Sequence, residues 1–126
     1  MKHKKKILLV DDTDIVRDVV SGFLESEGYT IEIACDGIEA IEKLNEVSFD
    51  VVITDIKMPR MDGIGLLREI KKFHPDTEVI LITGYDMPVS GAFLGTGAKA
   101  LIHKSCEVET FISQMLKAIE REGEEL

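Results

Sequence analysis

The chain has 126 residues, of which 44% are hydrophobic, and a formal net charge of −9 at pH 7. This length and composition fit one domain with its own packed core. The acidic excess argues against sequence-independent nucleic-acid binding, which needs a basic surface. We therefore expect one domain over residues 1–126, with a core at about 5–120 and frayed ends at 1–4 and 121–126.

The apolar segments are too short for export or membrane insertion. The stretch after the basic start covers only Ile7 to Val10, and a signal peptide needs about 7–15 apolar residues. No run approaches the roughly 20 residues of a membrane helix. Cys35 and Cys106 are far apart and match no metal or redox motif. These features predict a cytoplasmic protein with reduced thiols and no membrane partner.

Apolar runs typical of strands alternate with segments of helical spacing along the whole chain. The predicted strands are residues 5–10, 29–34, 49–54, 78–82 and 99–103. The predicted helices run from about residue 14 to 27, from 36 to about 44, and over 63–73, 87–97 and 108–119. Repeated strand–helix units imply one parallel sheet with right-handed crossovers and helices on both faces.

Single residues mark several of these boundaries. Gly28 suits the left-handed position after a helix, and Asp36 suits an N-cap. Pro75 stops a helix before residue 74, because the residue preceding a proline avoids the helical region. The segment 87–97 contains three glycines, each costing about 1 kcal/mol relative to alanine, so we expect a short, loosely held helix there.

Polar side chains stand where four of the apolar runs end. Asp11 and Asp12 follow the first strand, Asp55 the third, Thr83 the fourth and Lys104 the fifth. Ligand sites in open parallel sheets form at the carboxyl ends of the strands. Two carboxylates about 4 Å apart repel by about 4 kcal/mol at an effective dielectric near 20, so either a proton is held or a cation is bound. Carboxylates at such an edge predict a magnesium site that also suits phosphoryl transfer.

Five stretches of the chain carry motifs of one protein family. They are Leu9 to Asp12, Ala34 to Ala40, Asp55 to Gly63, Thr83-Gly84, and Gly97-Ala98 ahead of Lys104. In this order and spacing, the chain from Ile7 to Ile119 resembles a response-regulator receiver domain of two-component, phosphorelay signalling. The resemblance implies a flavodoxin-like, doubly wound α/β fold with a five-stranded parallel sheet, strand order 2-1-3-4-5, and five helices.

The resemblance also implies the roles of the acidic residues. Asp55 would accept a phosphoryl group from a phosphohistidine on a sensor histidine kinase or histidine phosphotransfer protein. Asp12 would bind Mg2+ directly, and Asp11 would hold it through water. The Asp55 carboxylate and the backbone carbonyl of Lys57 would complete the protein ligands.

Two further residues and a surface complete the implied switch. Thr83 would contact the phosphoryl group, and Lys104 would pair with it. Output would pass by protein contact through residues 87–97, 99–103 and 108–119 to an unknown downstream protein. The kinase would dock near the first helix and the loop after the last strand. Such a domain is not an enzyme acting on a separate substrate. We expect a monomer or weak dimer, either a stand-alone regulator or an excised receiver.

The sequence departs from the family pattern beside the lysine. The family usually has an aromatic residue three positions earlier and a cis-proline directly after it, and here Leu101 and Ser105 stand there. An aromatic rotamer switch therefore cannot operate, and signalling would rely on residues 87–97 and the loop before them. We expect a trans bond between Lys104 and Ser105, because a cis bond to a non-proline costs roughly 3 kcal/mol.

Two other interpretations of the sequence stay open. Asp12 and Asp14 share the spacing of the nucleophile and acid of haloacid-dehalogenase-type phosphatases. A second alternative is a binding module that keeps the fold without being phosphorylated. Separate replacement of Asp12 and Asp55 would distinguish the phosphatase from the phosphoacceptor.

Overall fold

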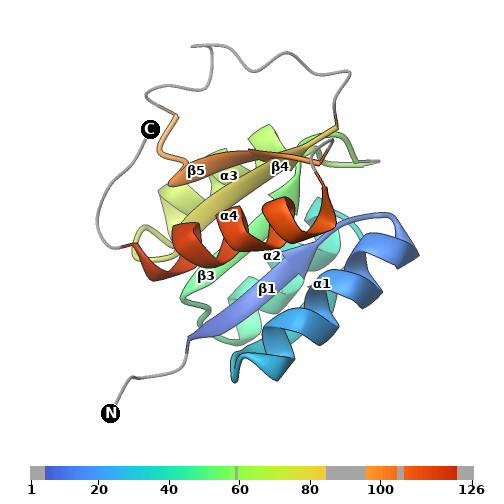
Figure 1. The fold of residues 1–126 in the computed structure, drawn as a ribbon. Helices are drawn as coiled ribbons and strands as arrows, with labels where there is room; N and C mark the ends of the chain where they lie inside the picture. Colours follow the sequence, from blue (N-terminus) through green and yellow to red (C-terminus); the bar gives the residue numbers. More distant parts are fainter. Residues whose placement is uncertain (1–4, 59, 85–95, 105–106, 122–126) are drawn as a thin grey trace.

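The computed structural model describes residues 5–58, 60–84, 96–104 and 107–121. Within these residues, five strands form one parallel sheet in the order β2-β1-β3-β4-β5, which confirms the predicted topology (Figure 1). The strands are β1 (Lys6–Val10), β2 (Thr30–Ala34), β3 (Val51–Asp55), β4 (Glu78–Thr83) and β5 (Ala100–His103).

The described part of the chain holds four helices, rather than the five that we expected. They are α1 (Asp14–Ser26), α2 (Gly37–Glu46), α3 (Gly63–Phe73) and α4 (Val108–Glu120). The remaining predicted helix, at 87–97, lies almost wholly outside the described residues, and its last two positions, Thr96 and Gly97, are not helical. The predicted trans bond to Ser105 also lies outside them.

The helices cover both faces of the sheet, α1 and α4 on one face and α2 and α3 on the other (Figure 1). Successive strand residues enter opposite cores: Leu8 and Val10 pack toward α2 and α3, while Ile7 and Leu9 pack toward α1 and α4. A strand buried on both faces needs an unbroken apolar run, and this explains the sequence of β1 and β3. None of the described helices is long and apolar enough to cross a membrane.

Local capping interactions confirm the predicted boundaries of the helices. Gly28 has a φ of 96° just after α1, a conformation that glycine adopts without steric cost. The Asp36 side chain accepts a hydrogen bond from the Glu39 N–H at 2.9 Å and so begins α2. The Asp62 side chain accepts one from the Gly65 N–H at 2.8 Å at the start of α3. Helix α3 ends before His74, as expected from Pro75.

Strand β3 extends one residue beyond its predicted end. Asp55 pairs with Ile82 of β4, and the Ile56 N–H donates to the Ile82 carbonyl at 3.0 Å. The candidate nucleophile is therefore held by the sheet itself, not by a free loop.

A glycine lets the loop after β3 return to the end of that strand. The Gly63 N–H donates to the Ile56 carbonyl at 2.8 Å. A Cβ at Gly63 would overlap the Asp55 carbonyl oxygen and lie 2.8 Å from the Ile56 Cα. Both neighbours are backbone atoms, so they cannot move aside as the end of a flexible side chain would. The close approach of α3 to Asp55 therefore requires glycine.

Gly63→Ala should destabilise the domain, and Gly22→Ala should not. The added methyl at residue 63 must displace backbone, and overpacking of this kind costs about 1–3 kcal/mol. Gly22 lies inside α1, and apart from its chain neighbours and the backbone of its own helix, no atom of the described residues lies within 4 Å of the position its Cβ would take. Alanine there should gain about 0.5–1 kcal/mol through helix propensity. Urea unfolding of both variants measures the difference, and equal stabilities would contradict this packing.

Candidate functional site

Three carboxylates meet at the carboxyl edge of the sheet. Asp11 and Asp12 follow β1, and Asp55 ends β3, the strand beside it. One carboxylate oxygen from each residue lies within 4.8 Å of the other two. Asp11 is fully buried, Asp55 is 8% exposed and Asp12 is exposed. The structure thus brings together the acidic residues that the sequence predicted at one edge.

Lys104 forms an ion pair with two of these carboxylates. Its Nζ lies 2.9 Å from Asp11 Oδ2 and 2.8 Å from Asp55 Oδ2. Lys104 comes directly after β5, which β4 separates from β3, so the long side chain must reach across the edge of the sheet. Its backbone N–H donates to the Thr83 carbonyl at 2.7 Å, which holds the base of the side chain beside β4. One ammonium therefore forms ion pairs with two buried carboxylates.

Thr13 fixes the orientation of Asp11. The Thr13 N–H donates to Asp11 Oδ1 at 2.8 Å, and the Thr13 hydroxyl donates to the same oxygen. Since Lys104 binds Asp11 Oδ2, both oxygens of this buried carboxylate accept hydrogen bonds. The Thr13 side chain makes no capping hydrogen bond at the start of α1, and its contact with Asp11 was not predicted. A hydroxyl residue two positions after a buried acid is the signal that could have revealed this contact.

Asp55 is held between the loop that follows it and the lysine. The Lys57 N–H donates to Asp55 Oδ1 at 3.2 Å, and Lys104 donates to Oδ2 at 2.8 Å. The peptide that follows Ile56 therefore lies at the pocket. Thr83 ends β4 at the same edge, with its side chain buried and its hydroxyl 3.4 Å from the Gly84 carbonyl oxygen. All six predicted site residues lie at or beside this edge.

The charges in the pocket are only partly balanced. Burial raises the pKa of Asp55, and the charge of Asp11 adds to this effect, although Lys104 opposes it. Burial also disfavours the charged form of Lys104, but its hydrogen bonds to Asp55 and Asp11 outweigh that effect and raise the pKa of Lys104. One ammonium pairs with two carboxylates, Asp11 and Asp55. When both are ionised, negative charge is therefore in excess.

Asp14 does not join the three carboxylates. Its side chain is 84% exposed and forms an ion pair with Arg17 in the first turn of α1. Among the described residues, the acidic cluster consists of Asp11, Asp12 and Asp55. An Asp12–Asp14 pair acting on one substrate, as in a haloacid-dehalogenase-type phosphatase, therefore finds no support in this geometry.

The donor set of the pocket fits Mg2+. Three carboxylate oxygens within 4.8 Å of one another are hard ligands, and Mg2+ prefers oxygen donors of this kind. The excess negative charge provides the electrostatic reason for a divalent cation.

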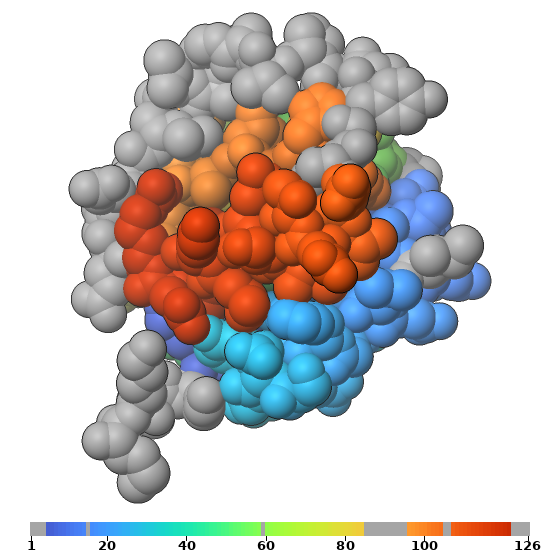
Figure 2. Space-filling view, in the orientation of Figure 1, coloured from blue at the N-terminus to red at the C-terminus, as the bar shows by residue number. Residues whose placement is uncertain are grey.

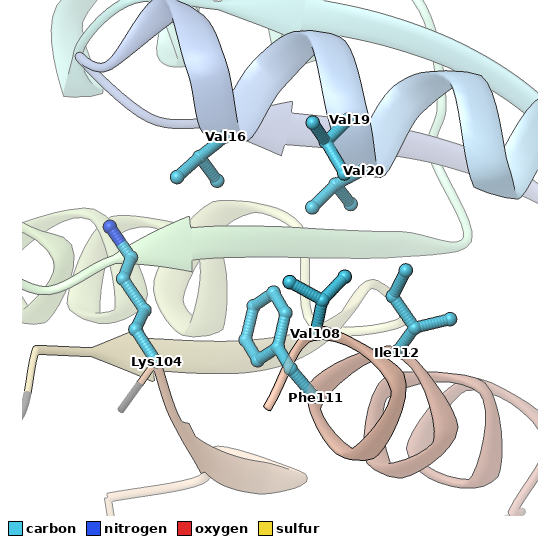
Figure 3. Close-up of a pocket in the computed structure, with 7 residues that line it drawn as sticks. All are labelled: Val16, Val19, Val20, Lys104, Val108, Phe111 and Ile112. Carbon is cyan, nitrogen blue, oxygen red and sulfur yellow. The ribbon is translucent and has the colours of Figure 1, made fainter. Parts of the chain in front are cut away.

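An apolar cavity of about 160 Å³ lies beside the pocket, between α1 and α4 (Figure 3). The side chains that line it are Val16, Val19, Val20, Lys104, Val108, Phe111 and Ile112. A second hollow continues along the two helices, shares Val108 and Ile112, and reaches Phe23 and Leu116. Helices α1 and α4 lie next to each other on this face of the molecule (Figure 2). We call the two hollows together the α1–α4 groove.

A doubly wound parallel sheet with an acidic pocket and a lysine at its carboxyl edge defines a class of signalling domain. The family model of the response regulator receiver domain matches residues 7–116. The chain belongs to this family, and the resemblance inferred from its motifs is confirmed.

Individual relatives agree with the assignment. The chain is 32% identical over 117 residues to the response regulator MprA of Mycobacterium ulcerans, which covers 92% of the chain and 50% of MprA. It is 46% identical over 81 residues to the sensor kinase CckA of Brucella abortus, covering 63% of the chain and 9% of CckA. A CheY-like receiver domain structure from Methanospirillum hungatei superposes with a TM-score of 0.81 at 32% identity, covering 94% of this chain and 95% of that one. The chain thus spans half or less of these two longer relatives.

Asp55→Asn should stabilise the metal-free domain, and increasingly so as the pH rises. Because burial raises the pKa of Asp55, the folded state keeps this proton at a pH where the unfolded chain, with an ordinary pKa of about 3.9, has lost it. The contribution of Asp55 to wild-type stability therefore falls as the pH rises from about 3.9 through the folded pKa. Asparagine does not titrate and avoids this loss.

Urea unfolding without metal, from below pH 3.9 to neutral pH (about the ordinary carboxyl range), measures the effect. The gap in unfolding free energy between the variant and the wild type should widen with pH. At the lowest pH both side chains are neutral, and the gap there serves as the internal reference. A gap that stays constant or narrows would contradict the assigned direction.

Proposed function

We propose that this chain is a phosphoacceptor switch, in which Asp55 receives a phosphoryl group from a phosphohistidine of a partner protein. The observation that supports it most directly is the pocket around Asp55, with two further carboxylates and the Lys104 ammonium 2.8 Å away. Phosphoryl transfer asks a protein mainly for alignment and charge compensation, and this set of side chains is suited to both.

Four groups would hold Mg2+ in this proposal. Asp12, whose side chain is exposed, would bind directly together with Asp55 and the Lys57 backbone carbonyl. Asp11, whose oxygens accept hydrogen bonds from Thr13 and Lys104, would act through water, as the family resemblance implies. Bound Mg2+ supplies charge compensation for the phosphoryl oxygens.

The transfer step needs Asp55 as its carboxylate. An oxygen of that carboxylate attacks phosphorus in line with the P–N bond of the phosphohistidine. A P–O bond forms, the P–N bond breaks, and its electron pair returns to the imidazole of the donor. The product on this chain is an acyl phosphate, which water later hydrolyses, releasing inorganic phosphate and restoring the carboxylate. The chain assists both steps on itself and turns over no separate substrate.

Lys104 and Thr83 would respond to the new group. The ammonium, now paired with Asp55 Oδ2, would pair with a phosphoryl oxygen, and the Thr83 hydroxyl would donate a hydrogen bond to another. Lys104 directly follows β5, and its stem lines the α1–α4 groove, so its movement would reach the surface. Output would then pass through residues 87–97, β5 and α4 to a downstream protein.

The phosphohistidine donor, a sensor kinase or a histidine phosphotransfer protein, would dock on the α1–α4 groove. The groove is apolar, and Val108 on its rim is 62% exposed. It adjoins the pocket at Lys104, so a partner seated there would lie close to Asp55.

The free, exposed thiol of Cys35 supports a reducing, cytoplasmic compartment. We propose a monomer or weak dimer as the working state.

Acetyl phosphate with Mg2+ should add the mass of one phosphoryl group to the wild type. Asp55→Asn should gain none, because the nucleophile is gone. Asp12→Asn should slow the reaction at limiting Mg2+ by at least about ten-fold, since loss of even an outer partner of a metal has that effect. Intact-mass spectrometry over time measures all three proteins. Asp14→Asn should react like the wild type.

Other outcomes of this experiment would favour one of the two alternative functions, a phosphatase or a binding module. Covalent phosphate that persists in Asp55→Asn but disappears in Asp12→Asn would favour the phosphatase chemistry. A wild type that binds Mg2+ and a beryllofluoride phosphate mimic weakly and never gains mass would favour a module that only binds partners.

Val108→Asp should impair phosphotransfer from the protein donor and leave the reaction with acetyl phosphate within about two-fold. A carboxylate on the groove would be buried without a partner on docking, so we expect a loss of about ten-fold or more, equivalent to 1.4 kcal/mol. Phe73→Asp is the matched control, because Phe73 is 60% exposed but lies at the end of α3, away from the groove. Equal losses in both variants, or none in Val108→Asp, would refute docking at this groove.

A further inference from the structure

A forked ion pair ties the loop between β3 and α3 to the start of α2. Arg60 Nε lies 2.9 Å from Asp36 Oδ2, and Arg60 Nη2 lies 2.9 Å from Asp36 Oδ1. Nη2 also lies 2.8 Å from Asp36 Oδ2, so the guanidinium contacts both carboxylate oxygens, and a pair of this kind fixes the geometry as well as the distance. The phosphoacceptor chemistry described above makes no use of either residue.

Asp36 is a firm anchor for this pair. The same carboxylate accepts the Glu39 N–H at 2.9 Å and thereby caps α2. Its side chain is only 14% exposed, whereas that of Arg60 is 58% exposed. The hydrogen bond from Arg60, followed by the backbone N–H of Glu39, lowers the pKa of Asp36, so it is a carboxylate at neutral pH. The capped end of α2 therefore offers Arg60 a fixed negative charge.

Arg60 itself adopts a backbone conformation that L residues avoid. Its φ is 69°, in the left-handed region, and among the described non-glycine residues it is the one with a positive φ. A residue with a side chain stays there only if its surroundings enforce it. The fork to Asp36 is an interaction on the far side of the loop that can do so.

The same loop carries the peptide that faces the pocket. The Lys57 N–H donates to Asp55 Oδ1, and the Gly63 N–H closes the loop onto the Ile56 carbonyl. Met61 packs on the first residue of α2 so closely that a Cβ at Gly37 would lie 2.7 Å from the Met61 carbonyl oxygen. Contacts to α2 on one side and to Asp55 on the other therefore hold the loop in place.

We propose that Arg60 is a positioning residue for the metal pocket: its fork to Asp36 holds the β3–α3 loop so that the backbone of Lys57 stays beside Asp55, where its carbonyl would reach Mg2+. The inference rests on the proposed function, because it assigns the Lys57 carbonyl to the metal. It predicts an effect on Mg2+ affinity and not on the transfer step once the metal is bound.

The sign of the effect separates positioning from simple electrostatics. Arg60→Ala removes a positive charge, and by charge alone it should tighten the binding of a cation. The proposal expects the opposite, a rise of about ten-fold in the dissociation constant for Mg2+, typical of losing an outer partner of a metal site. Arg60→Lys should fail to restore affinity, since an ammonium keeps the charge but cannot form the fork.

Two control variants test the effect of removing a distant charge and the effect of the backbone conformation at residue 60. Glu32→Gln removes the ion pairs with Lys6 and Lys43, and it should leave Mg2+ affinity unchanged. Arg60→Gly permits the positive φ without the fork and should bind Mg2+ as weakly as Arg60→Ala. If Arg60→Gly binds like the wild type, the backbone conformation alone is sufficient and the role of the fork is refuted.

Three readouts on folded protein complete the experiment. Calorimetry gives the Mg2+ dissociation constant, and the ¹H–¹⁵N signal of Lys57 in the metal-free variant should shift. The phosphorylation rate with acetyl phosphate should fall about ten-fold at limiting Mg2+, in step with affinity, and match the wild type at saturating Mg2+. An Arg60→Ala protein with wild-type or tighter Mg2+ binding and an unmoved Lys57 signal would overturn the proposal. A wild type that binds Mg2+ but never gains phosphate would instead refute the proposed function, while the affinity and NMR results would still decide the role of Arg60.

Discussion

The ammonium of Lys104 between two buried carboxylates is the interaction on which the rest of the site depends. Asp11, Asp12 and Asp55 bring three acids together, and Lys104 brings one positive charge to within 2.9 Å of two of them. Without that charge, burying Asp11 and Asp55 side by side would be strongly unfavourable. With it, the pocket is stable enough to fold but still too negative, which is the condition for binding a divalent cation.

The same side chain joins two regions of the molecule. Its charged end lies among the acids, while its stem lines the α1–α4 groove. A movement of the ammonium that also shifts the stem would change the wall of an apolar surface. This dual position gives a physical route between chemistry at Asp55 and a partner on α1 and α4. It requires no aromatic residue at the position of Leu101, which packs in part against the core formed with α2 and α3.

Much of the architecture could be predicted because each strand has a local signature. The run from Ile7 to Val10 is apolar on both faces, and β1 is indeed covered on both faces. Polar residues at strand ends then fall on one edge, because parallel strands share a direction. Asp11, Asp12 and Asp55 were found in this way, and the edge strand β2 is more exposed than β1 and β3.

Contacts between residues distant in the sequence left no such signature. Lys99 is 1% exposed, with its Nζ 3.0 Å from Glu78 Oε1 and 3.2 Å from the Ile119 carbonyl oxygen. Nothing in the local sequence distinguishes this buried lysine from a surface one. The fork between Arg60 and Asp36 joins residues 24 positions apart and was missed for the same reason. Patterns with periods of two or 3.6 identify faces, but they do not identify the partner that a long side chain finds across the fold.

Calorimetric titration of Mg2+ into the wild type and Lys104→Met tests the charge balance most directly. Methionine preserves much of the apolar stem and removes the ammonium. If Lys104 offsets the carboxylates, its loss should tighten Mg2+ binding by about ten-fold or more, a modest share of the roughly 4 kcal/mol between unit charges 4 Å apart at a dielectric near 20. Equal or weaker binding by the variant would show that the lysine does not balance the acids, and this account of the pocket would be wrong.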